Sequence, residues 1–129
     1  MNYRFLTLSF LTVTALLGCS QSKLPVTDLI RLNQLGYFPS EEKIAVADTA
    51  VTDNFQIRDV ASGKVVYRGV SSGIRPSAIS DKQRTVIEFS KVQAPGAYVI
   101  ELTGVGQSYP FEIKESLLRP LAVAAVKAF

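Results

Sequence analysis

Hydrophobic and polar residues alternate in short runs over the middle of the chain, and each run ends at turn-forming residues. Thr85, Ile87 and Phe89, for instance, share one side of such a run. A period of two is typical of β-strands that bury one face. Gly63 and Gly96 supply turns between runs. The pattern predicts about seven short strands, at 30–32, 43–47, 55–60, 65–68, 85–89, 97–102 and 108–113.

Short strands at this spacing predict an all-β fold, an immunoglobulin-like sandwich. The chain has one Cys and no Trp, so aliphatic and aromatic packing must replace the disulfide and Trp core of antibody domains. The segment from Ser71 to Gln83 is rich in polar residues and predicts a long loop. Glu88, Glu101 and Glu112 lie within expected strands, and we expect them on solvated faces.

The C-terminal residues change to the spacing of a helix. Pro120 suits the first position of a helix. Ten residues after Arg119 are too few for an independent helix, since isolated helices need about 12–15 residues. The apolar stripe of this helix also has nothing obvious left in the chain to cover it. We therefore expect a short helix that opens a larger domain and is mobile or partly melted in isolation over Leu117 to Phe129.

The N-terminus combines Arg4 with an apolar run from Phe5 to Leu17, too short for a membrane-spanning helix and suited to a secretory signal. The run ends in Leu-Leu-Gly-Cys, which resembles the lipobox of bacterial lipoproteins. That resemblance implies removal of a signal helix over 1–18 and a lipid on Cys19. The following segment is polar with one Pro and predicts a short tether over 19–28. Ser20 favours the outer membrane. The alternative is an ordinary signal peptide with an incidental Cys.

Composition excludes several classes of function. The chain lacks His, which excludes a Ser-His or Cys-His nucleophile pair and a His-ligated zinc or haem. A single Cys forbids an internal disulfide and a multi-Cys metal cluster. The net charge is only +3 and no basic cluster is present, so we expect no nucleic-acid partner.

Four oxygen-bearing residues between two expected strands suggest a calcium site: Asp48, Thr49, Asp53 and Asn54. Hard cations bind several oxygen ligands. The spacing matches no EF-hand loop, however, and solvated strand ends explain these residues more simply. We expect no metal and no cofactor.

Three stretches of the chain carry a resemblance to a known family. The first is I-R-L-N-Q-L-G-Y at 30–37, and the second is F-Q-I-R-D at 55–59 followed by G-K-V-V-Y at 63–67. The third joins E-F-S at 88–90, A-P-G-A-Y at 94–98 and V-G-Q-S-Y-P-F-E-I at 105–113. Together they resemble the N-terminal immunoglobulin-like domain of family 9 glycoside hydrolases, the cellulase N-terminal domain. The resemblance implies that domain over 29–115 and the start of a truncated catalytic domain over 116–129.

The resemblance also implies what the chain lacks. The family takes its catalytic base from a D-A-G-D-Y type motif and its general acid from a Glu far downstream, and this sequence contains no such motif. We therefore expect no catalytic residue and no activity from this chain alone. The implied function is a non-catalytic module of a lipid-anchored cellulase that degrades cellulose or β-glucan. It would pack against a catalytic barrel supplied in cis or as a split product.

The polar segment that opens the domain permits several interpretations. We expect contact with the catalytic barrel from Asn33, Gln34, Gly36, Tyr37, Leu121 and Phe129. Amides and Tyr also hydrogen-bond and stack on sugars, while a purely structural turn would place Gly36 at positive φ and pack Tyr37 on the sandwich. Tyr67, Tyr98 and Tyr109 are expected as core or edge aromatics. The alternative function is a free-standing surface lipoprotein that binds glycan or protein through one sandwich face.

Overall fold

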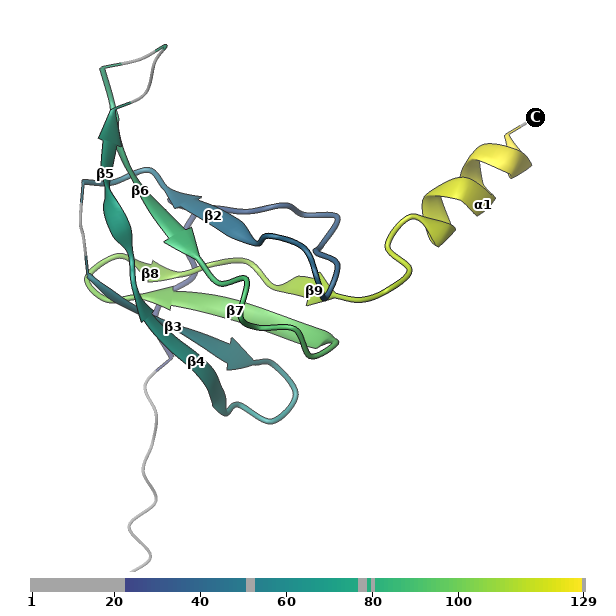
Figure 1. Cartoon of the computed structure of the whole chain (residues 1–129), viewed down its shortest axis with the longest axis horizontal. Helices are drawn as coiled ribbons and strands as arrows, with labels where there is room; N and C mark the ends of the chain where they lie inside the picture. The colour runs from purple at the N-terminus through teal and green to yellow at the C-terminus, as the bar shows by residue number, and fades with distance from the viewer. Residues whose placement is uncertain (1–22, 51–52, 77–78, 80, 129) are drawn as a thin grey trace, which may run out of the picture.

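The computed structural model describes residues 23–50, 53–76, 79 and 81–128, and the expected signal helix over 1–18 lies outside them. Within these residues the chain forms nine strands and one helix (Figure 1). In chain order they are β1 (Ile30–Arg31), β2 (Ile44–Ala47), β3 (Asn54–Asp59), β4 (Val65–Val70), β5 (Ser72–Pro76), β6 (Gln83–Glu88), β7 (Gly96–Leu102), β8 (Gly106–Gln107), β9 (Phe111–Ile113) and α1 (Arg119–Lys127).

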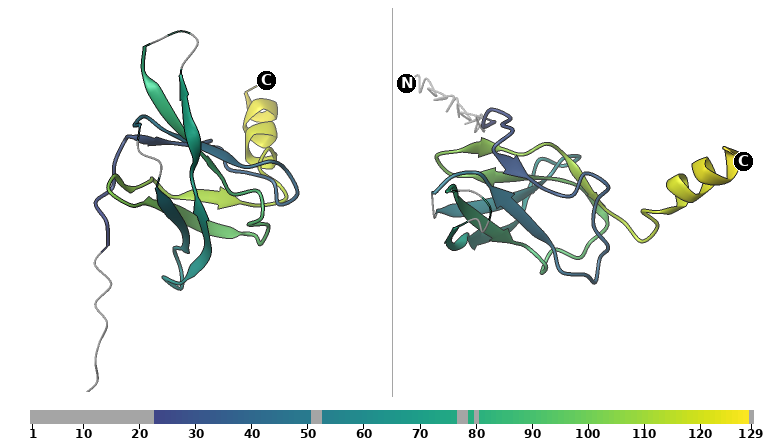
Figure 2. Two further views of the ribbon diagram at one scale, coloured as in Figure 1. Left: turned by 60° about the vertical axis from the view of Figure 1, so that its left-hand side comes forward. Right: turned by 90° about the horizontal axis from the view of Figure 1, so that it is seen from above.

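The strands form two sheets that pack face to face (Figures 1 and 2). One sheet has the order β1-β2-β6-β5, and the other has the order β4-β3-β7-β8 with β9 also paired to β7. Neighbouring strands in both sheets are antiparallel. This arrangement confirms the all-β, immunoglobulin-like sandwich.

Aromatic and aliphatic side chains fill the space between the sheets. Tyr37 meets Phe89 and Phe111 edge to face, with ring centroids 5.2 and 5.6 Å apart. Such aromatic pairs add about 0.5–1.5 kcal/mol beyond the area they bury. Ile87 and Thr85 are fully buried together with Phe89, as the alternation predicts. The core therefore holds the sheets together without a disulfide.

Strand β2 buries its small alanine side chains and exposes a larger aliphatic one. Ala45 and Ala47 face the core, whereas Ile44 is 40% exposed. Just before the strand, Lys43 is fully buried, and its Nζ donates hydrogen bonds to the carbonyl oxygens of Pro39 at 2.7 Å and Glu41 at 2.9 Å. Burial lowers the pKa of Lys43. The two carbonyl acceptors offset part of the cost of removing the ammonium from water.

The long loop expected over Ser71 to Gln83 is wrong, because β5 and the first residue of β6 lie within it. β5 is an edge strand whose register against β6 shifts between Ser72 and Ile74, around Gly73 at φ +46°. Pro76 ends the strand, where its missing N–H does not interrupt the sheet. Gly, Pro and Ser are typical of loops, and here they form a bulged edge strand instead.

The single strand expected over 108–113 is also wrong. It is replaced by β9 alone, while β8 lies before it and Pro110 lies between the two. Tyr109 therefore lies outside the strands, 48% exposed, and its hydroxyl donates to Asp28 Oδ1 at 2.9 Å. Tyr98 is a core residue, as expected, and Tyr67 packs against the edge of the core.

The N-terminal segment, residues 23–27, is fixed to the sandwich at its end. Thr27 N donates to Gln107 O at 2.9 Å, and Gln107 N donates to Pro25 O at 2.8 Å. Val26 thereby forms a parallel bridge with Gln107 on the edge of β8. These contacts lie within the stretch expected as a tether over 19–28, whose bounds stay a prediction.

Helix α1 confirms the short C-terminal helix and begins with Pro120 in its first turn. Figures 1 and 2 show it projecting from the sandwich on the side away from the N-terminal segment. In the part of the chain that the structure describes, no helix is long and apolar enough to cross a membrane.

Candidate functional site

The loop between β1 and β2 holds four of the residues expected at a domain contact. Asn33 Oδ1 accepts a hydrogen bond from Leu35 N at 3.0 Å, which fixes a tight turn. The Tyr37 hydroxyl accepts from Asn33 N at 3.1 Å and donates to Ile44 O at 2.7 Å. The Tyr37 side chain is buried, and burial raises its pKa. Tyr37 therefore holds the loop on the sandwich, as in the structural alternative, and offers no sugar-stacking face.

The same loop is joined to the last strand of the sandwich. Tyr37 N donates to Glu112 O at 2.8 Å, and Lys114 N donates to Tyr37 O at 3.0 Å. Tyr37 and Ile113 form a parallel bridge. The backbone of the loop thus extends the sheet beside β9, where the chain leaves the sandwich.

Gly36 lies where a side chain would collide with the segment that leaves the sandwich. Its φ is +103°, and a Cβ built on it would lie 2.5 Å from Glu112 O and 2.7 Å from Leu117 Cδ2. Leu117 is only 8% exposed. The absence of a side chain at Gly36 therefore makes room for Leu117. We call the group of Gly36, Tyr37, Glu112 and Leu117 the junction.

The junction fixes the chain directly before α1. Beyond Leu117, three large apolar side chains that the structure describes are exposed: Leu118 at 57%, Val123 at 47% and Val126 at 77%. A hollow of about 580 Å³ runs along this helix and is lined by Lys114, Ser116, Arg119, Pro120, Val123, Ala124 and Lys127. An apolar stripe of this kind is normally covered in a folded protein.

The other residues expected at a domain contact are either exposed or lie outside the described residues. Asn33 and Gln34 are exposed beside the junction, and Gln34 lines a shallow hollow with Arg31 and Tyr109. Phe129, the side chain of Leu121 and Cys19 lie outside the described residues. Contact with a catalytic domain stays a prediction for all of these. No local pattern of residues indicates that Leu117 meets Gly36.

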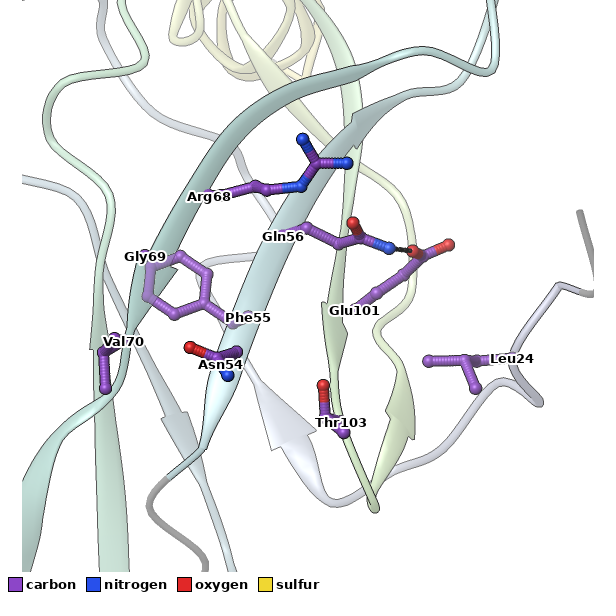
Figure 3. Close-up of a pocket in the computed structure, with 9 residues that line it drawn as sticks. All are labelled: Leu24, Asn54, Phe55, Gln56, Arg68, Gly69, Val70, Glu101 and Thr103. Atoms are coloured by element: carbon purple, nitrogen blue, oxygen red, sulfur yellow. Dashed lines mark hydrogen bonds between the residues drawn. The ribbon is translucent and has the colours of Figure 1, made fainter.

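A second hollow, of about 360 Å³, lies on the outer face of the sheet that contains β3, β4 and β7 (Figure 3). Gln56 stands between Arg68 on β4 and Glu101 on β7, as the strand register requires. Leu24 closes one end of the hollow, which is lined by Leu24, Asn54, Phe55, Gln56, Arg68, Gly69, Val70, Glu101 and Thr103.

Glu101 is buried at this face, so its expected place on a solvated surface is wrong. It is 4% exposed and accepts two hydrogen bonds from Arg58, Nε to Oε1 and Nη2 to Oε2, each 2.9 Å. Gln56 Nε2 donates to the same carboxylate. The Arg58 hydrogen bonds hold the pKa of Glu101 below its ordinary value. A glycosidase general acid needs a raised pKa, so Glu101 serves as a structural ion-pair partner.

The proposed calcium ligands are separated by other partners. Asp48 lies 3.7 Å from Lys82 Nζ and 3.6 Å from Arg84 Nε, whereas Asp53 Oδ1 accepts a hydrogen bond from Asn54 N at 2.6 Å and Asp53 N donates to Ser71 Oγ at 3.0 Å. Two cations beside Asp48 compete electrostatically with a metal ion. Among the described residues, no group of three or more acidic, Cys or His side chains has metal-binding geometry.

Comparison with known proteins decides the family. The family model described as cellulase N-terminal ig-like domain matches residues 26–107. The chain belongs to this family, the N-terminal Ig-like domains of family 9 cellulases. The chain is also 49% identical over 110 residues to the xyloglucan-specific endo-beta-1,4-glucanase BoGH9A of Bacteroides ovatus. It is 30% identical over 86 residues to Endoglucanase D of Acetivibrio thermocellus.

The Ig-like module spans only a small part of these relatives. The match covers 85% of this chain but 18% of the Bacteroides ovatus enzyme, and 65% of this chain but 13% of Endoglucanase D. A solved structure of Bacteroides ovatus GH9 superposes with a TM-score of 0.70 at 47% identity, over 81% of this chain and 19% of that one. A metagenome-derived family 9 endoglucanase gives 0.64 at 29% identity, over 78% and 20%.

Proposed function

We propose that the Ig-like module packs against a family 9 catalytic domain and supports it without contributing catalytic residues. The observation that carries this proposal is the junction, where Leu117 is buried against Gly36 immediately before α1. A flexible linker would leave such a residue exposed. The buried Leu117 instead fixes the direction in which the chain departs.

Helix α1 supplies the second argument. Its exposed residues Val123 and Val126, together with Leu118 directly before the helix, form an apolar stripe that the sandwich does not cover. A following domain would bury this stripe and meet Asn33 and Gln34 beside the junction. Burial contributes roughly 25 cal/mol per Å² of apolar surface, so it would stabilise both partners.

The substrate of the whole enzyme is proposed from the relatives. One relative is described as a xyloglucan-specific endo-beta-1,4-glucanase and another as an endoglucanase. We propose that the catalytic partner hydrolyses a β-1,4-glucan. The module stabilises and positions the catalytic domain, and the residues that select the polysaccharide belong to that domain.

One experiment separates this proposal from the alternative of a free-standing surface lipoprotein. The hollow of Figure 3 is the feature that favours binding of glycan or protein through a sandwich face. Reading the coding DNA beyond the codon of Phe129 should reveal a family 9 catalytic barrel, in frame or shifted. The absence of such a sequence would refute the accessory function and favour the free-standing lipoprotein.

We further propose that the chain is exported and anchored in the bacterial outer membrane through a lipid on Cys19. The support is the order of a charge, an apolar run and Leu-Leu-Gly before this Cys. Two or more acyl chains give stable anchoring, whereas one holds only marginally.

Replacing Cys19 by Ala should move the protein from the membrane fraction to the soluble fraction, because the thiol that carries the lipid is lost. Cell fractionation followed by immunoblotting measures this change. Ser20→Ala is the matched control and should leave the protein in the membrane. Retention of the Cys19→Ala variant in the membrane fraction would refute lipid anchoring.

A further inference from the structure

The N-terminal segment leaves the sandwich across the outer face of the sheet that contains β4, β3 and β7. Leu24 lines the hollow that also contains Arg68, as Figure 3 shows. Lys23 lines a neighbouring hollow with Arg58 and with residues of the β3–β4 turn. The next residues are held by Gln107 on β8. The direction from which the chain enters this domain is therefore fixed.

The distance from Cys19 to this face is short. Cys19 precedes Leu24 by five positions. A fully extended chain covers at most ~3.3–3.6 Å per residue, so these positions reach about 18 Å. A lipid on Cys19 would thus hold the face within that distance of the headgroups.

The face has the chemistry of a surface that meets anionic lipid. Along β4, Arg68 lies between Val66 and Val70, which are 49% and 69% exposed. Lys64, in the β3–β4 turn, is also exposed. No ion-pair partner of Arg68 is present among the residues that the structure describes. We call Lys64, Val66, Arg68 and Val70 the β4 face.

Acidic residues counter this charge only weakly. Glu101 is paired with Arg58 and buried, and Asp59, the last residue of β3, accepts hydrogen bonds from Ser62 in the adjoining turn. On the other sheet, by contrast, Arg84 and Lys82 lie beside Asp48. Exposed basic residues interspersed with aliphatic ones bind anionic membrane surfaces through both charge and apolar contact.

We propose that the β4 face rests on an anionic phospholipid surface when the chain is anchored through Cys19. This inference rests on the lipid attachment proposed above. Because α1 projects on the side of the sandwich away from the N-terminal segment, the module then holds the following domain away from the bilayer (Figures 1 and 2). The module acts as a rigid spacer with a defined orientation.

The single Cys permits a direct test with the processed chain, residues 19–129. Its thiol is coupled to a maleimide lipid in vesicles that contain phosphatidylglycerol, and acetylation of each Lys is followed by mass spectrometry. We expect Lys64 to react several-fold more slowly on the vesicles than in free solution, whereas Lys91 and Lys127 keep their rates. High salt should reduce the protection of Lys64, because it screens the charges.

Two variants separate the β4 face from a general crowding effect. Arg68→Glu should abolish most of the protection of Lys64, whereas Arg75→Glu, at an exposed position of β5, should leave it unchanged. Thermal unfolding confirms that both variants are folded. Equal reactivity of Lys64 on vesicles and in solution, or protection of Lys91 and Lys127 instead, would overturn the proposal. Chemical coupling replaces the natural lipid, so this outcome is independent of the Cys19→Ala result.

Discussion

Replacing Glu101 by Ala is expected to lower the free energy of unfolding by about 3–5 kcal/mol, because removal of one partner of a buried ion pair leaves the other charge uncompensated. Arg58 would lose both of its hydrogen bonds to the carboxylate, and its side chain is only 13% exposed. Urea denaturation measures this loss. A double replacement, Arg58→Met with Glu101→Leu, should restore most of the stability.

The control for this prediction is Glu112→Ala, because Glu112 carries an exposed carboxylate paired with the exposed Lys114. Exposed pairs contribute about 0–1 kcal/mol. If the two single variants lose the same stability, the buried pair does not stabilise the fold.

The pH dependence of the free energy of unfolding tests the same ion pair independently. The pKa of Glu101 is lowered in the folded state, chiefly by the Arg58 hydrogen bonds. The resulting stability is present above the ordinary Glu pKa of about 4.3 and is lost as the pH falls through the lower, folded value. The Glu101→Gln variant should therefore lose less folding stability than the unmodified protein when the pH is lowered.

Replacing Gly36 by Ala is expected to cost about 2–5 kcal/mol, the sum of the left-handed backbone cost and overpacking. The new Cβ would lie 2.5 Å from Glu112 O, a backbone atom that cannot move aside cheaply, and 2.7 Å from Leu117 Cδ2. Adding Leu117→Ala should relieve only the side-chain part of this clash. Chemical denaturation measures both variants.

Gly63→Ala provides the matched control for the junction. Gly63 also has a positive φ, +69°, but a Cβ there meets nothing within 4 Å. Only the left-handed backbone cost of about 1–2 kcal/mol should remain. Equal losses at Gly36 and Gly63 would contradict the close packing of the junction.

Local patterns predicted most of the sandwich because a period of two depends only on neighbouring residues. Thr85, Ile87 and Phe89 were assigned correctly for that reason. Strand β5 was missed because Gly73 and Pro76 are typical of loops, and only pairing with β6 shows how a bulged edge accommodates them.

Buried polar residues were not predictable, since their partners are distant in the sequence or depend on local backbone shape. Glu101 meets Gln56 and Arg58 through the register of β3 against β7. Lys43 is buried because carbonyl groups of the preceding loop turn toward its Nζ.

The candidate site was found only in part. Gly36 and Tyr37 were singled out as turn and aromatic residues, and the structure places both at the junction. Their contact with Glu112 and Leu117 brings together residues far apart in the chain. That proximity follows from the position of β9 beside the loop, which the sequence does not reveal.

If the Ig-like module stabilises a family 9 catalytic domain through the junction, it should do so in a chimera. In that chimera this module replaces the corresponding segment of the xyloglucan-specific endoglucanase of Bacteroides ovatus, and the half-life of xyloglucan-hydrolysing activity is measured at a raised temperature. We expect the chimera to keep its activity several times longer than the same enzyme without any module, and Leu117→Ala to remove much of this gain. A chimera that loses activity as fast as the enzyme without a module would refute stabilisation through the junction.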